Sequence, residues 1–319
     1  MLMSTRVKVI MVAGALAVLA LVLVVFRSGP PDPFYRGRRL SDYLDGFAGD
    51  GMQQNQEPPF GLVIIFQDTT DRRGSAWEAL PKFGTNALPF LIKHLQSRDS
   101  RFKQWLTRLA AKQSMLKLNL QSAYQKQTAA VVALTRLGTN ARPALPAIVR
   151  LLKEPHAARA ALYALNMIEA DPNDQILAVT NLLTGTGLRI ETEAMAVLGN
   201  LGTNASGATP ALLKELESTN TITRAMAAVA LVRIGADGEK VVPLITRYLQ
   251  QPGPALRYPA SDKHMYLWAL GQLGPRAREA FPIISNFVND PDRRISEAAK
   301  EALRQVDPMQ SQPDRSKSP

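Results

Sequence analysis

The chain offers few residues of the types that catalyse reactions or bind metals. It has 319 residues, no cysteine and three histidines, His94, His156 and His264. No two histidines have the spacing of a metal-binding pair. Without cysteine, thiol nucleophiles, zinc-thiolate centres and lipoprotein acylation are excluded. We therefore expect no catalytic residues, no cofactor and no metal, and we expect that the protein is not an enzyme.

The glycines and the acidic residues supply no catalytic motif either. The glycines recur singly after apolar residues, whereas a phosphate-binding loop clusters them after a strand. Acidic residues such as Glu191, Glu193 and Glu215 stand in segments of helical periodicity, where we expect them on the solvated surface. Binding is therefore the better class of function for this chain.

One basic segment is the first candidate for binding. Between residues 101 and 128 there are six cations and no acid, and Phe102, Trp105, Leu106 and Leu109 follow one helical face. We expect an inserted amphipathic helix over 101–121. Either its apolar stripe docks onto the body and the cations are solvated, or the segment is a basic platform for an acidic partner. The candidate contact residues are Arg101, Lys103, Arg108, Lys112 and Lys117. A capping box of Ser122 with Gln125 then predicts the start of the next helix.

A second candidate is the proline- and glycine-rich insertion at 251–263, which predicts a loop. Insertions in repeat arrays lie on one rim and are frequent contact points. Arg257 and Tyr258 are the candidate contact residues in it. A tolerated surface loop without a partner is the alternative.

These segments interrupt an internal repeat. Five times, an alanine-rich stretch ends at an apolar residue and a glycine, and a proline-led apolar stretch follows. A degenerate copy between the second and third has Glu169 in place of the glycine, and a final half-copy ends the series at residue 307. A period of a few tens of residues is typical of a stacked array. The five glycines are Gly84, Gly138, Gly202, Gly235 and Gly274.

Each half of a repeat has the pattern of a helix. Ala194, Val197, Leu198 and Leu201 fall on one helical face. The glycine suits a left-handed helix end, and the proline suits the first turn of the next helix, where no internal partner for its N–H is needed. The opening prolines are Pro89, Pro146, Pro210, Pro243 and Pro282. A pair of such helices covers only one apolar face, so each pair must stack on the next.

With its alanine-rich helix ending in Ala-Leu-x-x-Leu-Gly, as in ALTRLG at 133–138, the chain resembles the HEAT-repeat superfamily, in particular bacterial HEAT-like repeats of the phycobilisome-lyase type. The resemblance covers 71–307. It implies an all-α, right-handed α-solenoid of about six HEAT-like helix pairs plus a C-terminal capping helix. It also implies a concave surface offered to proteins or nucleic acids. The lyase activity has no cysteine-to-bilin chemistry to support it here.

The N-terminus predicts a membrane anchor. After a short basic tail, 1–8, the run 9–26 is free of charge and spans about 27 Å as a helix, enough for a bilayer core. A secretory signal, cleaved to release the body, is the alternative, but its apolar core is usually shorter. Basic residues on both sides leave the orientation open by the positive-inside rule. We place the body on the extracytoplasmic face of a bacterial membrane.

The segment 27–70 predicts a linker and an N-terminal cap. The sequence PFYRGRRLSDYLDGF resembles a short segment that often precedes such arrays, and implies a small helix capped by Ser41. DGMQQNQEPP predicts a flexible loop. FGLVIIF is compatible with a helix or a strand, and we favour a capping helix. The polar, proline-rich tail 308–319 predicts disorder.

The charge balance bears on the partner. The formal net charge is +11, of which residues 1–40 contribute +5, close to the anchor, where anionic lipid attracts it. The body, 41–307, carries only +5, which disfavours nucleic acid. The sequence predicts a membrane-tethered scaffold that binds a protein or peptide and has no catalytic activity. A lyase-like or enzyme accessory factor is the alternative, and a nucleic-acid-binding array is third. The oligomeric state stays open.

Overall fold

A computed structural model describes residues 30–47, 51–55, 61–65, 71–101, 103–105, 121–168, 171–183, 190–251 and 262–307. Within these residues no helix is both long enough and apolar enough to cross a bilayer. The run 9–26, for which an anchor is predicted, lies outside them, as does the tail 308–319.

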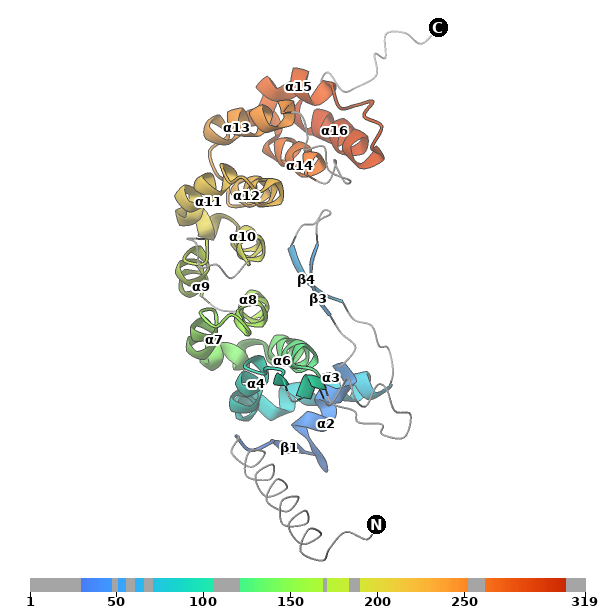
Figure 1. Cartoon of the computed structure of the whole chain (residues 1–319), viewed down its shortest axis with the longest axis vertical. Helices are drawn as coiled ribbons and strands as arrows, with labels where there is room; N and C mark the ends of the chain where they lie inside the picture. The colour runs from blue at the N-terminus through green and yellow to red at the C-terminus, as the bar shows by residue number, and fades with distance from the viewer. Residues whose placement is uncertain are drawn as a thin grey trace, which may run out of the picture.

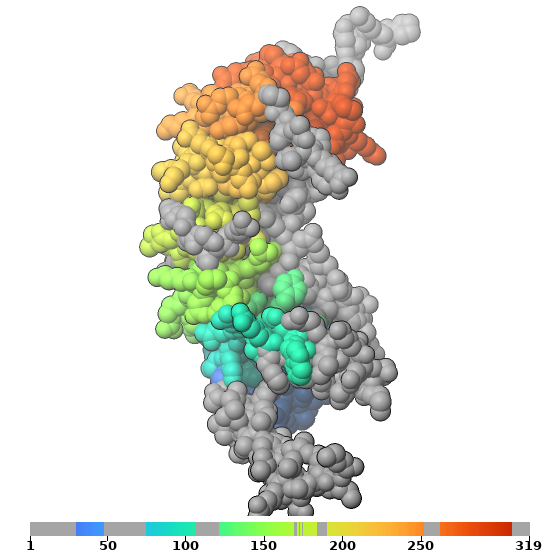
Figure 2. Space-filling view, viewed as in Figure 1, coloured from blue at the N-terminus to red at the C-terminus, as the bar shows by residue number. Residues whose placement is uncertain are grey.

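The described chain is an α-solenoid, so the all-α expectation is confirmed (Figure 1). Six helix pairs are followed by a single last helix. The first helices line the inner side of the curved column and the second helices lie outside them, and successive pairs touch along its length (Figure 2). The pairs are α3 (Asp71–Phe83) with α4 (Leu88–Leu95), α6 (Ala123–Leu137) with α7 (Leu145–Leu151), α8 (Ala158–Met167) with α9 (Pro172–Thr180), α10 (Glu191–Asn200) with α11 (Thr209–Leu216), α12 (Thr221–Arg233) with α13 (Gly238–Gln250), and α14 (Lys263–Leu273) with α15 (Phe281–Ser285), before α16 (Arg293–Val306).

Glycine ends the first helix through its backbone conformation. All five repeat glycines have φ between 55° and 76°. Gly138 and Gly274 combine this with ψ of −127° and −136°, so they adopt a region reserved for glycine and not the left-handed helical one that the sequence suggested. In four repeats a 3-10 helix follows: η2 (Gly84–Ala87), η3 (Gly138–Ala144), η4 (Gly202–Ala208) and η5 (Gly274–Ala280).

The prolines open the second helix in four pairs. Pro89, Pro146, Pro210 and Pro282 occupy its first turn. Pro243 was wrongly placed there, because it lies inside α13. That helix begins five residues earlier, where the carboxylate of Asp237 accepts a hydrogen bond from the backbone N–H of Glu239 at 3.1 Å.

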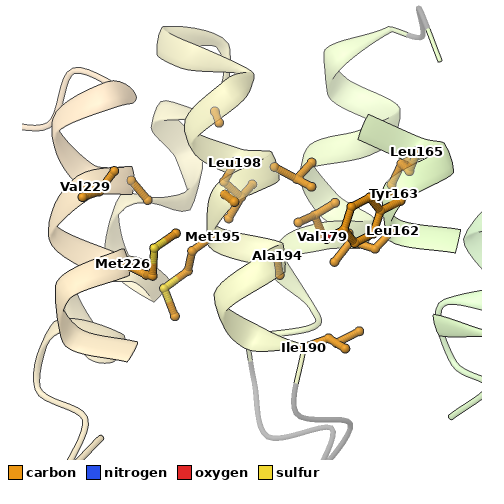
Figure 3. Close-up of a cluster of buried hydrophobic side chains, with 14 of the residues drawn as sticks. Leu162, Tyr163, Leu165, Val179, Ile190, Ala194, Met195, Leu198, Met226 and Val229 are labelled. Carbon is orange, nitrogen blue, oxygen red and sulfur yellow. The ribbon is translucent and has the colours of Figure 1, made fainter. Parts of the chain in front are cut away.

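The core runs continuously through the first helices. Every residue from 225 to 232 of α12 is buried, which no helix with a solvated face allows. Small residues let neighbouring first helices approach closely. A Cβ added to Gly199 of α10 would lie 3.5 Å from Cα of Ala230 on α12, the next first helix. Figure 3 shows Leu198 within the apolar cluster that joins α8, α10 and α12.

An N-terminal cap covers the first pair. It consists of the strands β1 (Phe34–Tyr35) and β2 (Arg38–Arg39), the helix α2 (Leu40–Leu44) and the 3-10 helix η1 (Asp45–Phe47). Leu40 and Phe47 are fully buried, and α2 packs on α3. The prediction that Ser41 caps this helix was wrong. Ser41 lies within α2, and its hydroxyl donates to Oδ2 of Asp32 at 2.6 Å.

The cap is followed by a second hairpin in place of the predicted loop and capping helix. Its strands β3 (Gly51–Asn55) and β4 (Gly61–Ile65) pair antiparallel, from Gly51 opposite Ile65 to Asn55 opposite Gly61. The expectation of a helix over FGLVIIF was therefore wrong. β-branched residues at 63–65 favour the extended chain, and a run of this length is too short for a helical period to show.

Truncating Leu198 tests the stacking of the pairs. Leu198→Ala is expected to lower the free energy of unfolding by about 2 to 5 kcal/mol, because it leaves a cavity between first helices. Urea denaturation followed by circular dichroism measures it. Leu177→Ala is the matched control, because that leucine is 70% exposed on α9 and its loss should cost under about 0.5 kcal/mol. Equal costs for the two variants would contradict the stacked core.

Alanine at Gly138 tests the glycine conformation. A Cβ at this position meets no atom within 4 Å, so the expected destabilisation of roughly 1 to 3 kcal/mol comes from the backbone alone. Gly207→Ala provides the comparison, because Gly207 also has open space around it and has no positive φ. The same denaturation series measures both. A neutral Gly138→Ala would show that the helix end tolerates an ordinary backbone.

Candidate partner-binding surface

The β3–β4 hairpin lies along the inner side of the array. Strand β3 contacts α6 and strand β4 contacts α10, which is two helix pairs further along (Figure 1). A segment that precedes the whole array in sequence therefore covers part of the surface that a solenoid usually offers to a partner. Between α6 and α10, a partner meets this hairpin before it meets the helices.

The base of the 101–121 insertion is closed by a polar clamp. Nζ of Lys103 lies 2.7 Å from Oδ1 of Asp99 and also donates to the carbonyl oxygen of Gln121, where the chain returns. The backbone N–H of Ala123, at the start of α6, donates to the same Asp99 oxygen at 2.9 Å. The side chain of Gln121 donates to Asp45 in the cap. The base of the insertion is thus anchored both to the start of α6 and to the N-terminal cap.

Electrostatics favour this clamp. Partial burial raises the pKa of Asp99, but the hydrogen bonds from Lys103 and from the Ala123 N–H, together with the Lys103 charge, hold the pKa below its ordinary value. The carboxylate therefore stays ionised at neutral pH. The predicted capping box is also present, since Ser122 Oγ accepts from Gln125 N at 3.1 Å and Gln125 Oε1 accepts from Ser122 N at 2.8 Å.

The predicted basic contact residues do not all have the same role in the structure. Lys103 is engaged in the clamp, whereas Arg101 is exposed. The other predicted contacts of this segment, Arg108, Lys112 and Lys117, lie outside the described residues. The structure therefore brings Arg101 and Lys103 to one base, and it assigns Lys103 to holding the base closed.

Two aromatic side chains lie exposed beside the clamp. Trp105, two residues after Lys103, is 55% exposed, and Tyr124, at the start of α6, is 46% exposed. The other members of the predicted stripe, Phe102, Leu106 and Leu109, lie outside the described residues, so the choice between docking onto the body and a basic platform stays a prediction. Tryptophan, tyrosine and arginine are the residues that dominate the energetics of protein interfaces. The sequence placed Trp105 on an apolar stripe but gave no sign that it would be exposed.

A cluster of one cationic and two aromatic side chains lies near the two ends of the second insertion. Arg257 and Tyr258 themselves lie outside the described residues. At the base, the rings of Tyr248 and Tyr266 stack with centroids 6.2 Å apart, and the guanidinium of Arg224 lies 4.8 Å from the Tyr248 centroid. Burial raises the pKa of Tyr266, so its phenol stays protonated. Sequence reasoning missed this cluster because its members come from three different helices.

A polar ladder joins the C-terminal ends of successive first helices. The side-chain amide of Asn200 donates to Oδ1 of Asn166 at 3.0 Å, and Arg233 donates to Oδ1 of Asn200 at 3.2 Å. Further along, Gln272 donates to Gln305 at 3.3 Å. Asn200, Arg233 and Gln272 each stand two residues before a repeat glycine, and that regular position was the signal available in the sequence.

Two buried polar groups also join neighbouring pairs. The amide of Gln127 on α6 donates to carbonyl oxygens of Leu95 and His156, at 3.2 and 2.8 Å. Glu193, which we expected on the solvated surface, is buried instead, and its carboxylate lies 3.2 Å from Nη2 of Arg159 on the preceding first helix. Both were missed because their partners are about 30 residues away in sequence.

Within the described residues, no group of three histidines, cysteines or acidic residues could hold a metal ion. His264 is buried in α14, and the ring of His94 packs against Phe90, so these residues contribute to separate parts of the fold. The described geometry thus consists of a polar clamp with exposed aromatic side chains beside it and an inner side that the hairpin partly covers.

No protein-family model matches this sequence, and no curated protein matches it significantly. Among solved structures, the chain is similar to two engineered proteins from a structural genomics programme. One is 19% identical with a TM-score of 0.45, covering 71% of this chain and 96% of the other. The second is 18% identical with a TM-score of 0.43, covering 74% and 69%. At this level of similarity neither supports any statement on function.

Removing the β3–β4 hairpin tests whether it covers the inner side. Because Gly51 pairs with Ile65, a short Gly-Ser linker can replace 51–65 without moving the flanking chain. Amide hydrogen exchange in α10 is expected to accelerate roughly fivefold or more, the factor that about 1 kcal/mol of lost local stability gives. Exchange in α13, a second helix on the outer side of the column, serves as the internal control (Figure 1). Unchanged exchange in α10 would show that the hairpin contributes no cover.

Proposed function

We propose that this protein is a membrane-tethered HEAT-like scaffold, a right-handed solenoid that binds a protein or peptide partner and performs no catalysis. The stacked pairs support this proposal, because a column of helices offers a long surface of fixed shape. Rigid elements carrying exposed aromatic and basic side chains favour binding, since little conformational entropy is lost on association.

The observation that carries the proposal is the exposure of Trp105 at a closed base. More than half of this tryptophan is accessible, although the chain on both sides of the insertion is anchored through Asp99 and Lys103. An exposed indole on an anchored base is preorganised for an interface. Arg101 and Tyr124 lie within a few residues of the same clamp and extend the contact with charge and a second ring.

The covered inner side makes this insertion a better contact than the concave face. The β3–β4 hairpin already lies against two of the first helices, α6 and α10. A partner that binds between these helices has to displace the hairpin or bind over it. In the described part of the insertion, Arg101 and Trp105 are exposed to a partner without that cost, so we assign this insertion the primary contact.

The tether in this proposal is the apolar run 9–26, inserted as a single transmembrane helix with the body outside the cytoplasm. Its length and lack of charge support the proposal. A tether restricts the partner to proteins that reach the membrane surface, and it raises the local concentration of scaffold and partner there.

Site-specific photo-crosslinking in the native membrane tests this function. With benzoylphenylalanine at position 105, we expect an adduct of one discrete mass, because this side chain lies in the contact. The matched control carries the same group at Leu177, an exposed apolar residue on α9, and should give no such adduct. Denaturing electrophoresis and mass spectrometry read both experiments.

Two substitutions sharpen the result. Trp105→Ala is expected to weaken partner binding about 30-fold, the typical loss for truncating an aromatic anchor by 2 kcal/mol. Arg101→Glu should weaken it further if the partner is acidic. Lys103 is left intact, because its removal opens the clamp and confounds binding with folding. Equal adduct yields at 105 and 177 would exclude the insertion as the contact.

A further inference from the structure

The turn between β1 and β2 presents three arginines to solvent. Arg36, Arg38 and Arg39 are all exposed, and Gly37 completes the turn. We propose that this turn binds the phosphate groups of anionic lipids at the surface of the membrane in which the chain is anchored. The proposal rests on the membrane tether of the proposed function and adds a ligand and the residues that bind it.

The nearby carboxylates accept hydrogen bonds from groups other than the three guanidinium groups. Both oxygens of Asp32 accept hydrogen bonds from Ser41, from its hydroxyl at 2.6 Å and its backbone N–H at 3.1 Å. The carboxylate of Asp42 accepts from the backbone N–H of Arg39 at 3.0 Å. Across the described part of the chain, no carboxylate lies within ion-pair distance of any of the three guanidinium groups.

The backbone of the turn is held in an unusual conformation. Arg36 has φ of 46° and Gly37 has φ of 80°, the pair of positive values that characterises a tight two-residue hairpin. Arg36 is the only non-glycine residue of the described chain with positive φ. Asparagine, aspartate or glycine would adopt this conformation more readily, so arginine there is a strained choice. The turn and the strand β2 after it thus carry three cationic side chains within the four residues 36–39.

An apolar side chain stands beside these charges. Phe34, which opens β1, is 66% exposed, and the guanidinium of Arg36 lies 5.5 Å from the centroid of the adjacent Tyr35 ring. Arginines with an exposed aromatic residue form a pattern suited to the interface of a bilayer, where the ring enters the headgroup layer and the cations meet phosphate.

The position of the turn in the chain favours the membrane as its ligand. Only seven residues lie between Phe26, the end of the predicted anchor, and Phe34, so eight residue steps limit the distance to roughly 29 Å at full extension. Three of those seven residues are prolines, a composition that favours an extended, semi-rigid linker. The turn is thus tethered within reach of the lipid headgroups. A soluble anion that binds these arginines has to compete with the phosphates of a membrane surface that is always nearby.

The test uses the full chain in lipid nanodiscs. The sequence contains no cysteine, so Phe34→Cys carries an environment-sensitive fluorophore at a single position. Nanodiscs of phosphatidylcholine are compared with nanodiscs that contain about 30% phosphatidylglycerol, which supplies the surface potential. We expect a blue shift and a rise in emission only with the anionic lipid, and a loss of both at high salt.

Removing two arginines should remove the effect. Arg36→Gln with Arg38→Gln is expected to weaken surface contact about 30-fold, the factor that two basic side chains near an anionic surface supply. The matched control, Lys240→Gln with Lys300→Gln, removes the same charge from exposed positions on α13 and α16 and should keep the shift. Circular dichroism on both variants checks that they fold alike.

Three results would overturn the proposal. They are no shift with phosphatidylglycerol in the parent protein, an equal shift in the double arginine variant, and a shift in phosphatidylcholine nanodiscs on addition of millimolar inorganic phosphate, which would identify a free-anion site. Extraction of native membranes with alkaline carbonate reads the tether separately. Release of the chain would refute the anchor of the proposed function, whereas a retained chain without a lipid-dependent shift refutes the arginine turn alone.

Discussion

The contact between successive first helices is the constraint on which the rest of the structure depends. A helix pair buries one face by itself, and the remaining apolar surface is covered only when the next pair stacks on it. In α12 this burial extends to every residue from 225 to 232, so the helix has no solvated face left over that stretch. Glycine and alanine at the crossings bring neighbouring backbones into van der Waals contact. Every segment that is not part of the stack must therefore attach to its surface, as the cap does at one end and the hairpin does on the inner side.

The insertion at 101–121 is attached by polar bonds between distant parts of the chain. Asp99 and Lys103 close the base of one insertion, and Gln121 ties that base to the N-terminal cap. Within the stack, the ladder of Asn166, Asn200 and Arg233 links three first helices by bonds of the same kind. Such bonds fix the position of side chains without adding to the core. They leave Trp105 accessible on an anchored base, which is the arrangement that an interface requires.

The stacked helix pairs could be predicted from the sequence because the pattern that produces them is repeated. Each copy of the glycine and proline pattern supports the others, so Gly138 and Gly202 mark helix ends even where single propensities are weak. The same reasoning failed for the hairpin at 51–65, since that segment occurs once and its apolar run is too short for a period. It failed again for Glu193, because the partner of that carboxylate is Arg159, which lies in another repeat.

The sequence by itself determined the all-helical stack, the glycine ends, the capping box at Ser122, and the places where the repeat is interrupted, because all of these depend on residues close together in the chain. Only the tertiary structure decided that Lys103 belongs to a clamp, that Trp105 is exposed, and that a hairpin covers the inner side from α6 to α10. The reason is physical. Local patterns fix backbone conformation and the buried face of a helix, whereas a surface is formed by segments far apart in sequence, whose meeting no local pattern records.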